Sequence, residues 1–360
     1  MPRPRGAAPE LVRKIAHPRP SINAGLTTGI LHATMDRLEA LQRWLADRFP
    51  DKDFALAPAS ADASFRRYFR VTFATGTPRT LIAMDAPPER EDCRPFVHVA
   101  GLLAAAGLHA PRVVDQDLER GFLLLTDLGD TTYLTALQAD SSHADRLFGD
   151  AIEAIVRWQL ASRPGELPPY DAALLRRELE LFPDWYIAKH LGIALAPAET
   201  EALQRTFALI IASNLSQPQV YVHRDYMPRN LMVCDPNPGI LDFQDAVYGP
   251  ITYDVACLFK DAFMSWDEER VLDWTIRYWE KARHARLPVD ADFGAFFRGL
   301  EWMGLQRHLK VAGIFARLAH RDGKHGYLAD TPRFIGYIRA VCRRYDTLKP
   351  LALLLDELER

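Results

Sequence analysis

The chain has 360 residues, of which 48% are hydrophobic, and this is enough for two lobes that each bury a core but too little for several large domains. Its 44 basic and 47 acidic residues nearly balance, so the totals favour neither nucleic acid nor an anionic membrane as a partner. No apolar run approaches the ~20 residues that span a bilayer, and the four cysteines lack metal or redox spacing. We therefore expect a soluble, cytoplasmic, monomeric protein with a small-molecule partner.

Residues 1–34 carry basic residues, Pro, Gly and Thr without periodicity, which predicts a disordered N-terminal extension. From Met35 onward, apolar residues recur at helical spacing, at Leu38, Leu41, Leu45 and Phe49. Met35 is therefore a candidate for the biological start, and a transit peptide is the competing interpretation.

Residues 54–127 show short segments of strand character, around Phe69–Phe73, Thr80–Met84 and Gly121–Thr126. One helical stretch, from Cys93 to Ala106, interrupts them, and Gly107 is suited to end it. These patterns predict a small antiparallel sheet, and we assign residues 35–127 to a nucleotide-binding N-lobe.

From Thr131 onward, long helical patterns dominate, broken by one β-rich segment from Gln219 to Leu241. We assign residues 128–360 to a mostly helical C-lobe that carries the catalytic loop and the acceptor pocket. The predicted fold class is therefore α+β, a bilobal fold with a β-rich N-lobe on a mostly helical C-lobe.

The pattern H-R-D-x-x-x-x-N begins at His223, in a polar turn between two apolar segments. In phosphoryl transfer, such a turn supplies a carboxylate that accepts a hydrogen bond from the nucleophile, here Asp225, and a carboxamide that reaches magnesium, here Asn230. Asp242 ends the next apolar segment and is suited to bridge Mg²⁺ to phosphate oxygens. Each of these residues alone is compatible with an ordinary turn, but together they predict a kinase that uses ATP and Mg²⁺.

The sequence resembles the aminoglycoside/choline phosphotransferase family over roughly residues 35–345. The resemblance rests on His223-Arg-Asp225, Asn230, Leu241-Asp-Phe243 and Gly249-Pro-Ile-Thr-Tyr-Asp-Val-Ala256. Members phosphorylate small hydroxylated metabolites, and the resemblance implies their protein-kinase-like bilobal fold. The resemblance implies that Asp254 opens a helix and holds the catalytic loop by hydrogen bonds, and that His223 is structural.

A narrower resemblance points to the bacterial kinases that phosphorylate the C1 hydroxyl of N-acetylmuramate and N-acetylglucosamine in peptidoglycan recycling. The matching runs are His223–Met232, Leu241–Pro250, Ala63–Phe69, Met84–Pro88 and Gln306–Phe315. The resemblance implies a sugar acceptor. Two alternatives stay open, a kinase for another hydroxylated molecule such as an aminoglycoside, and a nucleotide-binding pseudokinase.

The chain departs from the kinase pattern where ATP phosphates are usually gripped. Residues 53–125 contain no lysine, Met84 occupies the expected lysine position, and residues 51–75 contain no glycine. We hypothesise that Arg66 and Arg67 bind the phosphates instead, because guanidinium donates two parallel hydrogen bonds to phosphate oxygens. The alternative is a solvated basic turn.

Adenine is expected against the connection between the lobes, with Thr126 and Leu128 as candidate contacts. Kinase-like folds hydrogen-bond the base there through backbone groups, so these two positions are expected from their place in the chain and not from their side chains.

Basic residues outnumber acidic ones in residues 290–345, which disfavours a polycationic acceptor. Arg307, Lys310 and Arg317 share one face of a predicted helix, and we hypothesise that Arg307 and Lys310 bind a carboxylate such as the lactyl group of N-acetylmuramate. A solvent-facing stripe is the alternative. Trp185 and Tyr186 are candidates for stacking on a sugar, or for the core.

Overall fold

The computed structural model describes residues 24–60 and 65–358, without the side chains of residues 24–35 and 60. Residues 1–53 and residues 54–360 form separate units. The first unit contains α1 (Ala24–Arg48), which confirms the helix predicted after Met35 but starts earlier. Residues 24–34, where we expected disorder, form the first turns of α1, because extending a helix is much easier than nucleating one. The rest of the expected extension, residues 1–23, lies outside the described residues.

The second unit starts with a five-stranded antiparallel sheet in the order β1-β2-β3-β5-β4. Its strands are β1 (Phe54–Ser60), β2 (Arg67–Phe73), β3 (Thr80–Asp85), β4 (Val113–Asp117) and β5 (Phe122–Thr126). The sheet confirms the predicted antiparallel arrangement. Its last strand ends at Thr126, where the chain passes into the helical region.

Helix α2 (Arg94–Ala105) joins β3 to β4 and confirms the helix predicted between Cys93 and Ala106. Pro95 is suited to the first turn of this helix, because a backbone N–H there would have no acceptor within the helix and proline lacks one. Gly107 follows the helix with a φ of +69°, a left-handed conformation that glycine adopts without strain.

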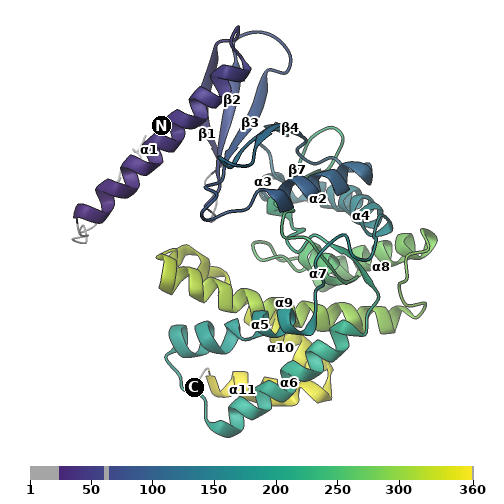
Figure 1. The fold of residues 1–360 in the computed structure, drawn as a ribbon. Coiled ribbons are helices and arrows are strands. Elements are labelled where there is room, and N and C mark those ends of the chain that lie inside the picture. The colour runs from purple at the N-terminus through teal and green to yellow at the C-terminus, as the bar shows by residue number, and fades with distance from the viewer. Residues whose placement is uncertain (1–23, 61–64, 359–360) are drawn as a thin grey trace, which may run out of the picture. The chain divides into compact units, whose positions relative to one another are not determined.

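The region after Thr126 is mostly helical, as predicted. Its helices are α3 (Tyr133–Ala139), η1 (Ser141–His143), α4 (Ala144–Leu160), α5 (Ala172–Leu179), the π-helical η2 (Phe182–Leu191), α6 (Pro197–Leu215), η3 (Pro228–Asn230), α7 (Tyr253–Phe259), α8 (Glu268–His284), α9 (Phe293–Asp322), η4 (His325–Asp330), α10 (Thr331–Arg344), η5 (Asp346–Leu348) and α11 (Lys349–Leu358). Figure 1 shows the sheet at one end of this unit and α6, α10 and α11 at the other.

The predicted β-rich segment contains β6 (Gln219–Val222), β7 (Leu231–Met232) and β8 (Gly239–Ile240). β7 pairs with β8, whereas β6 pairs with β9 (Val247–Pro250), which lies beyond the predicted end of the segment. These two short ladders fix both ends of the turn that carries the H-R-D motif.

Helix α9 is the central element of the helical region and contacts η2, α10, α7 and α6. The apolar arc predicted for it is buried, at Trp302, Leu305, Leu309, Ala312 and Ala316. At Gly313 a Cβ atom would lie 2.3 Å from the carbonyl oxygen of Leu181, so only glycine permits this approach of the residue just before η2. Among residues 24–60 and 65–358, no helix is both long and apolar enough to cross a membrane.

Candidate active site

The turn after β6 is held by the carboxylate of Asp254, at the start of α7. The backbone N–H of His223 donates to Asp254 Oδ2 at 2.6 Å, and that of Arg224 donates to Asp254 Oδ1 at 3.0 Å. Arg224 has a φ of +77°, which is uncommon for a residue with a side chain. Burial raises the pKa of Asp254 to about 7, and the two backbone donors oppose that rise. The structure therefore contains the loop-holding hydrogen bonds expected for Asp254.

His223 lies inside this turn and is buried. Burial lowers the pKa of His223 to about 4, so the ring is neutral at physiological pH. Its Nδ1 atom accepts a hydrogen bond from the backbone N–H of Asp225 at 3.3 Å. This contact restrains the backbone at Asp225, which fits a structural role for His223.

Asn230 and Asp242 come together from η3 and from the segment after β8. The Asn230 amide Nδ2 donates to the backbone oxygen of Asp225 at 2.9 Å and lies 3.4 Å from Asp242 Oδ2. Asn230 Oδ1 accepts no hydrogen bond within the described residues. Asp242 has a φ of +61°, a conformation that Asp tolerates better than most residues. Carboxylate and carboxamide oxygens are ligands that suit Mg²⁺, and Asp242 and Asn230 supply one of each.

Two cavities meet at these residues. The first, which we name the hinge cavity, has a volume of about 270 Å³ and is lined by β3, β5 and the connection that follows, including Thr126 and Leu128. The second, the α9 cavity, has a volume of about 210 Å³ and is lined by Asp225 and by one face of α9. Asn230 and Asp242 line both cavities. The structure thus brings the predicted catalytic, metal and adenine-side residues to one continuous region.

Arg66 and Arg67 point to different partners. Arg67 Nε donates to Asp85 Oδ2 at 2.9 Å, and Asp85 is fully buried on β3. Arg66 Nη2 lies 4.0 Å from Oδ1 of Asp242, the predicted metal ligand. Arg66 is therefore the better placed of the two predicted phosphate ligands.

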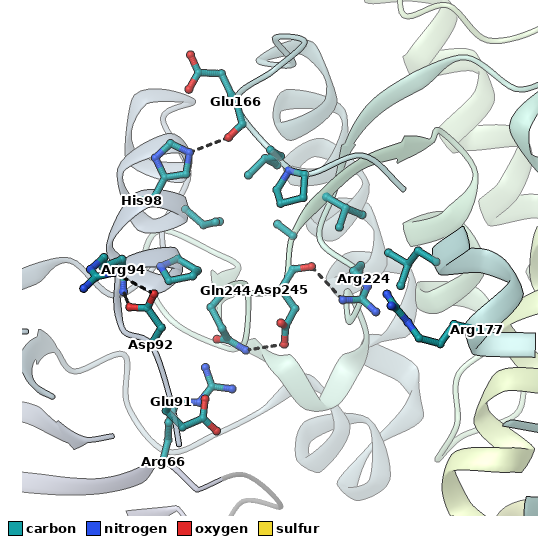
Figure 2. Close-up of a pocket in the computed structure, with 17 residues that line it drawn as sticks. Arg66, Glu91, Asp92, Arg94, His98, Glu166, Arg177, Arg224, Gln244 and Asp245 are labelled. Atoms are coloured by element: carbon teal, nitrogen blue, oxygen red, sulfur yellow. Dashed lines mark hydrogen bonds and ion pairs between the residues drawn. The ribbon is translucent and has the colours of Figure 1, made fainter. Parts of the chain in front are cut away.

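Arg66 also lines a third cavity of about 750 Å³, between α2 and the segment after Asp242. Figure 2 shows Arg66 below Gln244 and Asp245 on the wall of this cavity. Gln244 Nε2 donates to Asp242 Oδ1 at 2.9 Å, which orients the carboxylate from that side.

Arg70 on β2 is a site residue that the sequence did not indicate. It lines the hinge cavity, and its guanidinium forms ion pairs with Asp127 and Asp130 and donates to the Gly129 oxygen. These contacts tie the sheet to the connection between the lobes. Arg70 lies 57 residues before Asp127 and 60 before Asp130, so no motif spacing links it to them.

Arg307 and Lys310 both line the α9 cavity, but they differ in their partners. Lys310 Nζ lies 2.9 Å from Glu178 Oε1 and donates to the Tyr253 hydroxyl at 3.0 Å. Arg307 is 2% exposed and donates to the backbone oxygen of Lys260 at 3.1 Å. Among the described residues, no carboxylate pairs with Arg307. Burial would lower the pKa of Arg307, but nearby acidic groups, Asp261 and Asp225 among them, keep it raised, so this cation is charged although no carboxylate of the described residues lies within ion-pair distance of it.

The rest of the α9 cavity is apolar and aromatic, with Phe263, Phe315 and Tyr327 among its lining residues. The lining positions on α9 follow helical spacing, at Arg307, Lys310, Val311, Ile314, Phe315 and Leu318. That periodicity was visible in the sequence, whereas the contribution of Phe263 and Tyr327 required the folded chain. Arg317, Trp185 and Tyr186 do not line the α9 cavity.

Glu178 on α5 is a second residue without a sequence signal. This buried carboxylate accepts hydrogen bonds from Arg224 Nη2 at 2.6 Å, from Gln306 Nε2 at 3.0 Å, and from the Tyr170 hydroxyl. Burial alone would raise its pKa, but the charges of Lys310 and Arg224 lower the pKa of Glu178 to about 2. Glu178 therefore links the catalytic turn to the cationic face of α9.

A two-lobed fold with this turn between the lobes defines a phosphotransferase of the kinase-like class. The chain belongs to the Phosphotransferase enzyme family, whose sequence pattern matches residues 55–289. Two relatives share about half of their residues with it. The chain is 53% identical to a Pseudomonas aeruginosa protein named N-acetylmuramate/N-acetylglucosamine kinase, over 89% of this chain and 97% of that one. It is 50% identical to a Neisseria meningitidis protein of the same name, over 90% and 96% of the two chains.

Solved structures at much lower identity share the fold. An ADP-bound aminoglycoside phosphotransferase, APH(2'')-Ib, superposes with a TM-score of 0.55 at 13% identity, covering 83% of this chain and 97% of that one. A Plasmodium vivax ethanolamine kinase superposes with a TM-score of 0.57 at 9% identity, covering 82% and 84%. These likenesses confirm the predicted kinase-like fold class.

Replacing Glu178 by Gln is expected to lower the free energy of unfolding by about 3–5 kcal/mol at pH 7, because Arg224 and Lys310 would lose their buried counter-charge. Since the folded pKa of Glu178 is below the ordinary value of 4.5, its contribution is present above pH 4.5 and is lost as the pH falls toward 2. Urea unfolding of both proteins at pH 7 and pH 3 measures the difference, which should shrink at pH 3.

Glu180→Gln is the matched control, because Glu180 is a partly exposed carboxylate near Arg176, with 3.7 Å between Oε1 and Nη1. It should cost less than about 1 kcal/mol. Equal losses for the two variants would contradict the assigned role of Glu178.

Proposed function

We propose that this chain transfers the γ-phosphoryl group of ATP to the anomeric C1 hydroxyl of N-acetylmuramate and N-acetylglucosamine, in the cytoplasm and as a monomer. The observation that carries the proposal is the junction of the hinge cavity and the α9 cavity at Asn230 and Asp242, with Asp225 on the acceptor side. The names of the relatives at 50–53% identity support the choice of sugars.

The nucleotide is assigned to the hinge cavity, with its base against Thr126 and Leu128 and its phosphates directed to Asp242. Asn230 and Asp242 would hold Mg²⁺, which would neutralise charge on the phosphate oxygens. Arg66, 4.0 Å from Asp242, is placed to contact the same phosphates from the α2 side. Arg67, paired with Asp85, is assigned to the sheet.

The sugar is assigned to the α9 cavity, where Asp225 faces its hydroxyl. Asp225 orients the oxygen for in-line attack and accepts its proton as the bond to phosphorus forms. The aromatic rings of Phe263, Phe315 and Tyr327 provide apolar faces for the pyranose ring.

Arg307 is assigned to the lactyl carboxylate of N-acetylmuramate. A charged guanidinium that is 2% exposed and has no carboxylate partner among the described residues is most stable with an anion from the substrate. Lys310 already has Glu178 as its counter-ion, so it supports the wall of the α9 cavity and does not select between sugars.

The rival functions differ in features of this site. An aminoglycoside carries several positive charges and would meet Arg307 in the acceptor cavity, which is unfavourable. A pseudokinase would have no use for the complete set of Asp225, Asn230 and Asp242. A panel of amino sugars, aminoglycosides and protein with Mg·ATP separates these possibilities, and methyl glycosides, whose C1 oxygen is blocked, must fail as acceptors.

Asp225→Asn is expected to lower kcat by about 10²–10⁴-fold, because the amide cannot accept the acceptor's proton. The affinity for ATP should stay within about threefold, since Asp225 lines the acceptor side. Steady-state kinetics and nucleotide titration measure the two effects. Full activity of the variant would rule out Asp225 as the base.

Arg66→Gln is expected to weaken Mg·ATP binding about tenfold, the loss of roughly one charge-assisted hydrogen bond. Arg67→Gln is the matched variant, one residue away. It should reduce thermal stability, because Asp85 would be left buried without its cation, and should leave nucleotide affinity nearly unchanged. Isothermal titration calorimetry measures the affinity of each variant for Mg·ATP, and unchanged affinity in Arg66→Gln contradicts the phosphate assignment.

Arg307→Gln is expected to lower kcat/KM for N-acetylmuramate by about 10–100-fold and to leave the value for N-acetylglucosamine within about threefold, because only the first sugar has a carboxylate. Lys310→Gln should change both values by the same factor. If Arg307→Gln does not fold, Arg307→Lys, which keeps the charge, takes its place in this comparison. An equal loss for both sugars in the arginine variants would exclude carboxylate recognition.

A further inference from the structure

The phosphoryl group has to cross the boundary between the hinge cavity and the α9 cavity, if the proposed function is right. Three residues line both cavities: Arg229, Asn230 and Asp242. Asn230 and Asp242 are assigned to the metal ion. Arg229 has no role in the site as described so far.

Arg229 is the cationic side chain that lines both cavities among the described residues. No lysine of the described chain lines the hinge cavity, and the other arginine there, Arg70, is engaged with Asp127 and Asp130 at the connection between the lobes. Lys310 and Arg307 line the α9 cavity only. Positive charge at the crossing point itself therefore comes from Arg229.

The side chain of Arg229 is restrained in a way that suits this position. Its Cζ atom lies 4.9 Å from the centroid of the Phe263 ring, on the wall of the α9 cavity. Stacking on an aromatic face holds a guanidinium in one plane. The backbone is held by η3, where Pro228 is buried and the Asn230 N–H donates to the Met227 oxygen at 2.8 Å. A preorganised donor of this kind needs little rearrangement when charge develops.

We propose that Arg229 is a catalytic residue that binds the equatorial oxygens of the γ-phosphoryl group during its transfer. In this step the bond between phosphorus and the β,γ-bridging oxygen breaks, and its electron pair stays on ADP. A new bond forms between phosphorus and the acceptor oxygen, whose proton goes to Asp225. Arg229 keeps its proton and donates hydrogen bonds to oxygens that carry the most exposed charge at mid-transfer.

This role differs from the one assigned to Arg66. Arg66 lies on the α2 side of Asp242 and lines neither the hinge cavity nor the α9 cavity, so it acts on bound ATP before transfer. Arg229 lies between donor and acceptor, so its contacts strengthen only when the phosphoryl group moves. Substituting Arg66 should therefore change nucleotide affinity, whereas substituting Arg229 should change kcat.

The test compares Arg229→Gln and Arg229→Lys with the native chain. The glutamine variant should lose about 10²–10³-fold in kcat, the range seen when one transition-state donor is removed, with the KM for ATP and the affinity for ADP within about threefold. The lysine variant keeps the charge but lacks the paired donors, so it should recover part of the loss.

Arg283→Gln is the matched control. Arg283 is an exposed arginine whose Cζ also lies 4.9 Å from an aromatic centroid, that of Trp279, on α8 and outside the three cavities described above. It should keep native kcat, which separates loss of a stacked arginine in general from loss of this one.

A binding measurement gives a readout independent of turnover. In the native chain, Mg·ADP with aluminium fluoride and sugar mimics the transferring group and should bind much more tightly than Mg·ADP with sugar. Arg229→Gln should lose most of this added affinity and keep the affinity for Mg·ADP. Native kcat in Arg229→Gln, or retention of the added affinity, overturns the proposal.

Circular dichroism and thermal unfolding monitor the fold, and Arg229→Lys decides by the same two measurements if the glutamine variant is unfolded. An inactive native chain would instead contradict the proposed function, so the two failures are distinguishable.

Discussion

The active site depends on one constraint, the hold of a buried carboxylate on two consecutive backbone N–H groups. Asp254 accepts from His223 and Arg224, and this pair of hydrogen bonds stabilises the left-handed conformation of Arg224. Because that conformation reverses the chain, Asp225 emerges toward the α9 cavity, and Asn230 returns to meet Asp242. Without the Asp254 carboxylate, two buried N–H groups would be left unpaired, and the conformation of the turn would lose the hydrogen bonds that stabilise it.

A second buried carboxylate couples this turn to the acceptor side. Glu178 binds Arg224 of the H-R-D turn and Lys310 of α9, so it joins the turn that carries Asp225 to the helix that lines the α9 cavity. Arg307, which lines the same cavity, has no ion pair with a carboxylate among the described residues. The two neighbouring cations on one helix face therefore differ: Lys310 is paired within the chain, and Arg307 is the one that we propose for a ligand.

Much of this architecture could be predicted because it is local in sequence. The strand alternation, the helix before Gly107 and the H-R-D turn each depend on residues within about a dozen positions, as does the helical face of α9. The roles of Glu178 and Arg70 could not be predicted, since their partners come from distant segments and a charged residue on a helix or strand usually faces water. The same holds for Phe263, which reaches the α9 cavity from the segment after α7. The early start of α1 was missed for another reason, because weak helix formers continue a helix that stronger neighbours have nucleated.

The absence of lysine from the lining of the hinge cavity, within the described residues, bears on how such an enzyme is detected. Nucleotide reagents that acylate the phosphate-binding lysine of ordinary kinases need a nucleophilic amine close to ATP. Met84, fully buried in the sheet, offers none, and guanidinium groups stay protonated and react poorly with acyl donors. Chemical proteomics with these probes would therefore count this enzyme as missing from a cell in which it is present and active. Competition with a fluorescent nucleotide, which needs no covalent capture, would find it.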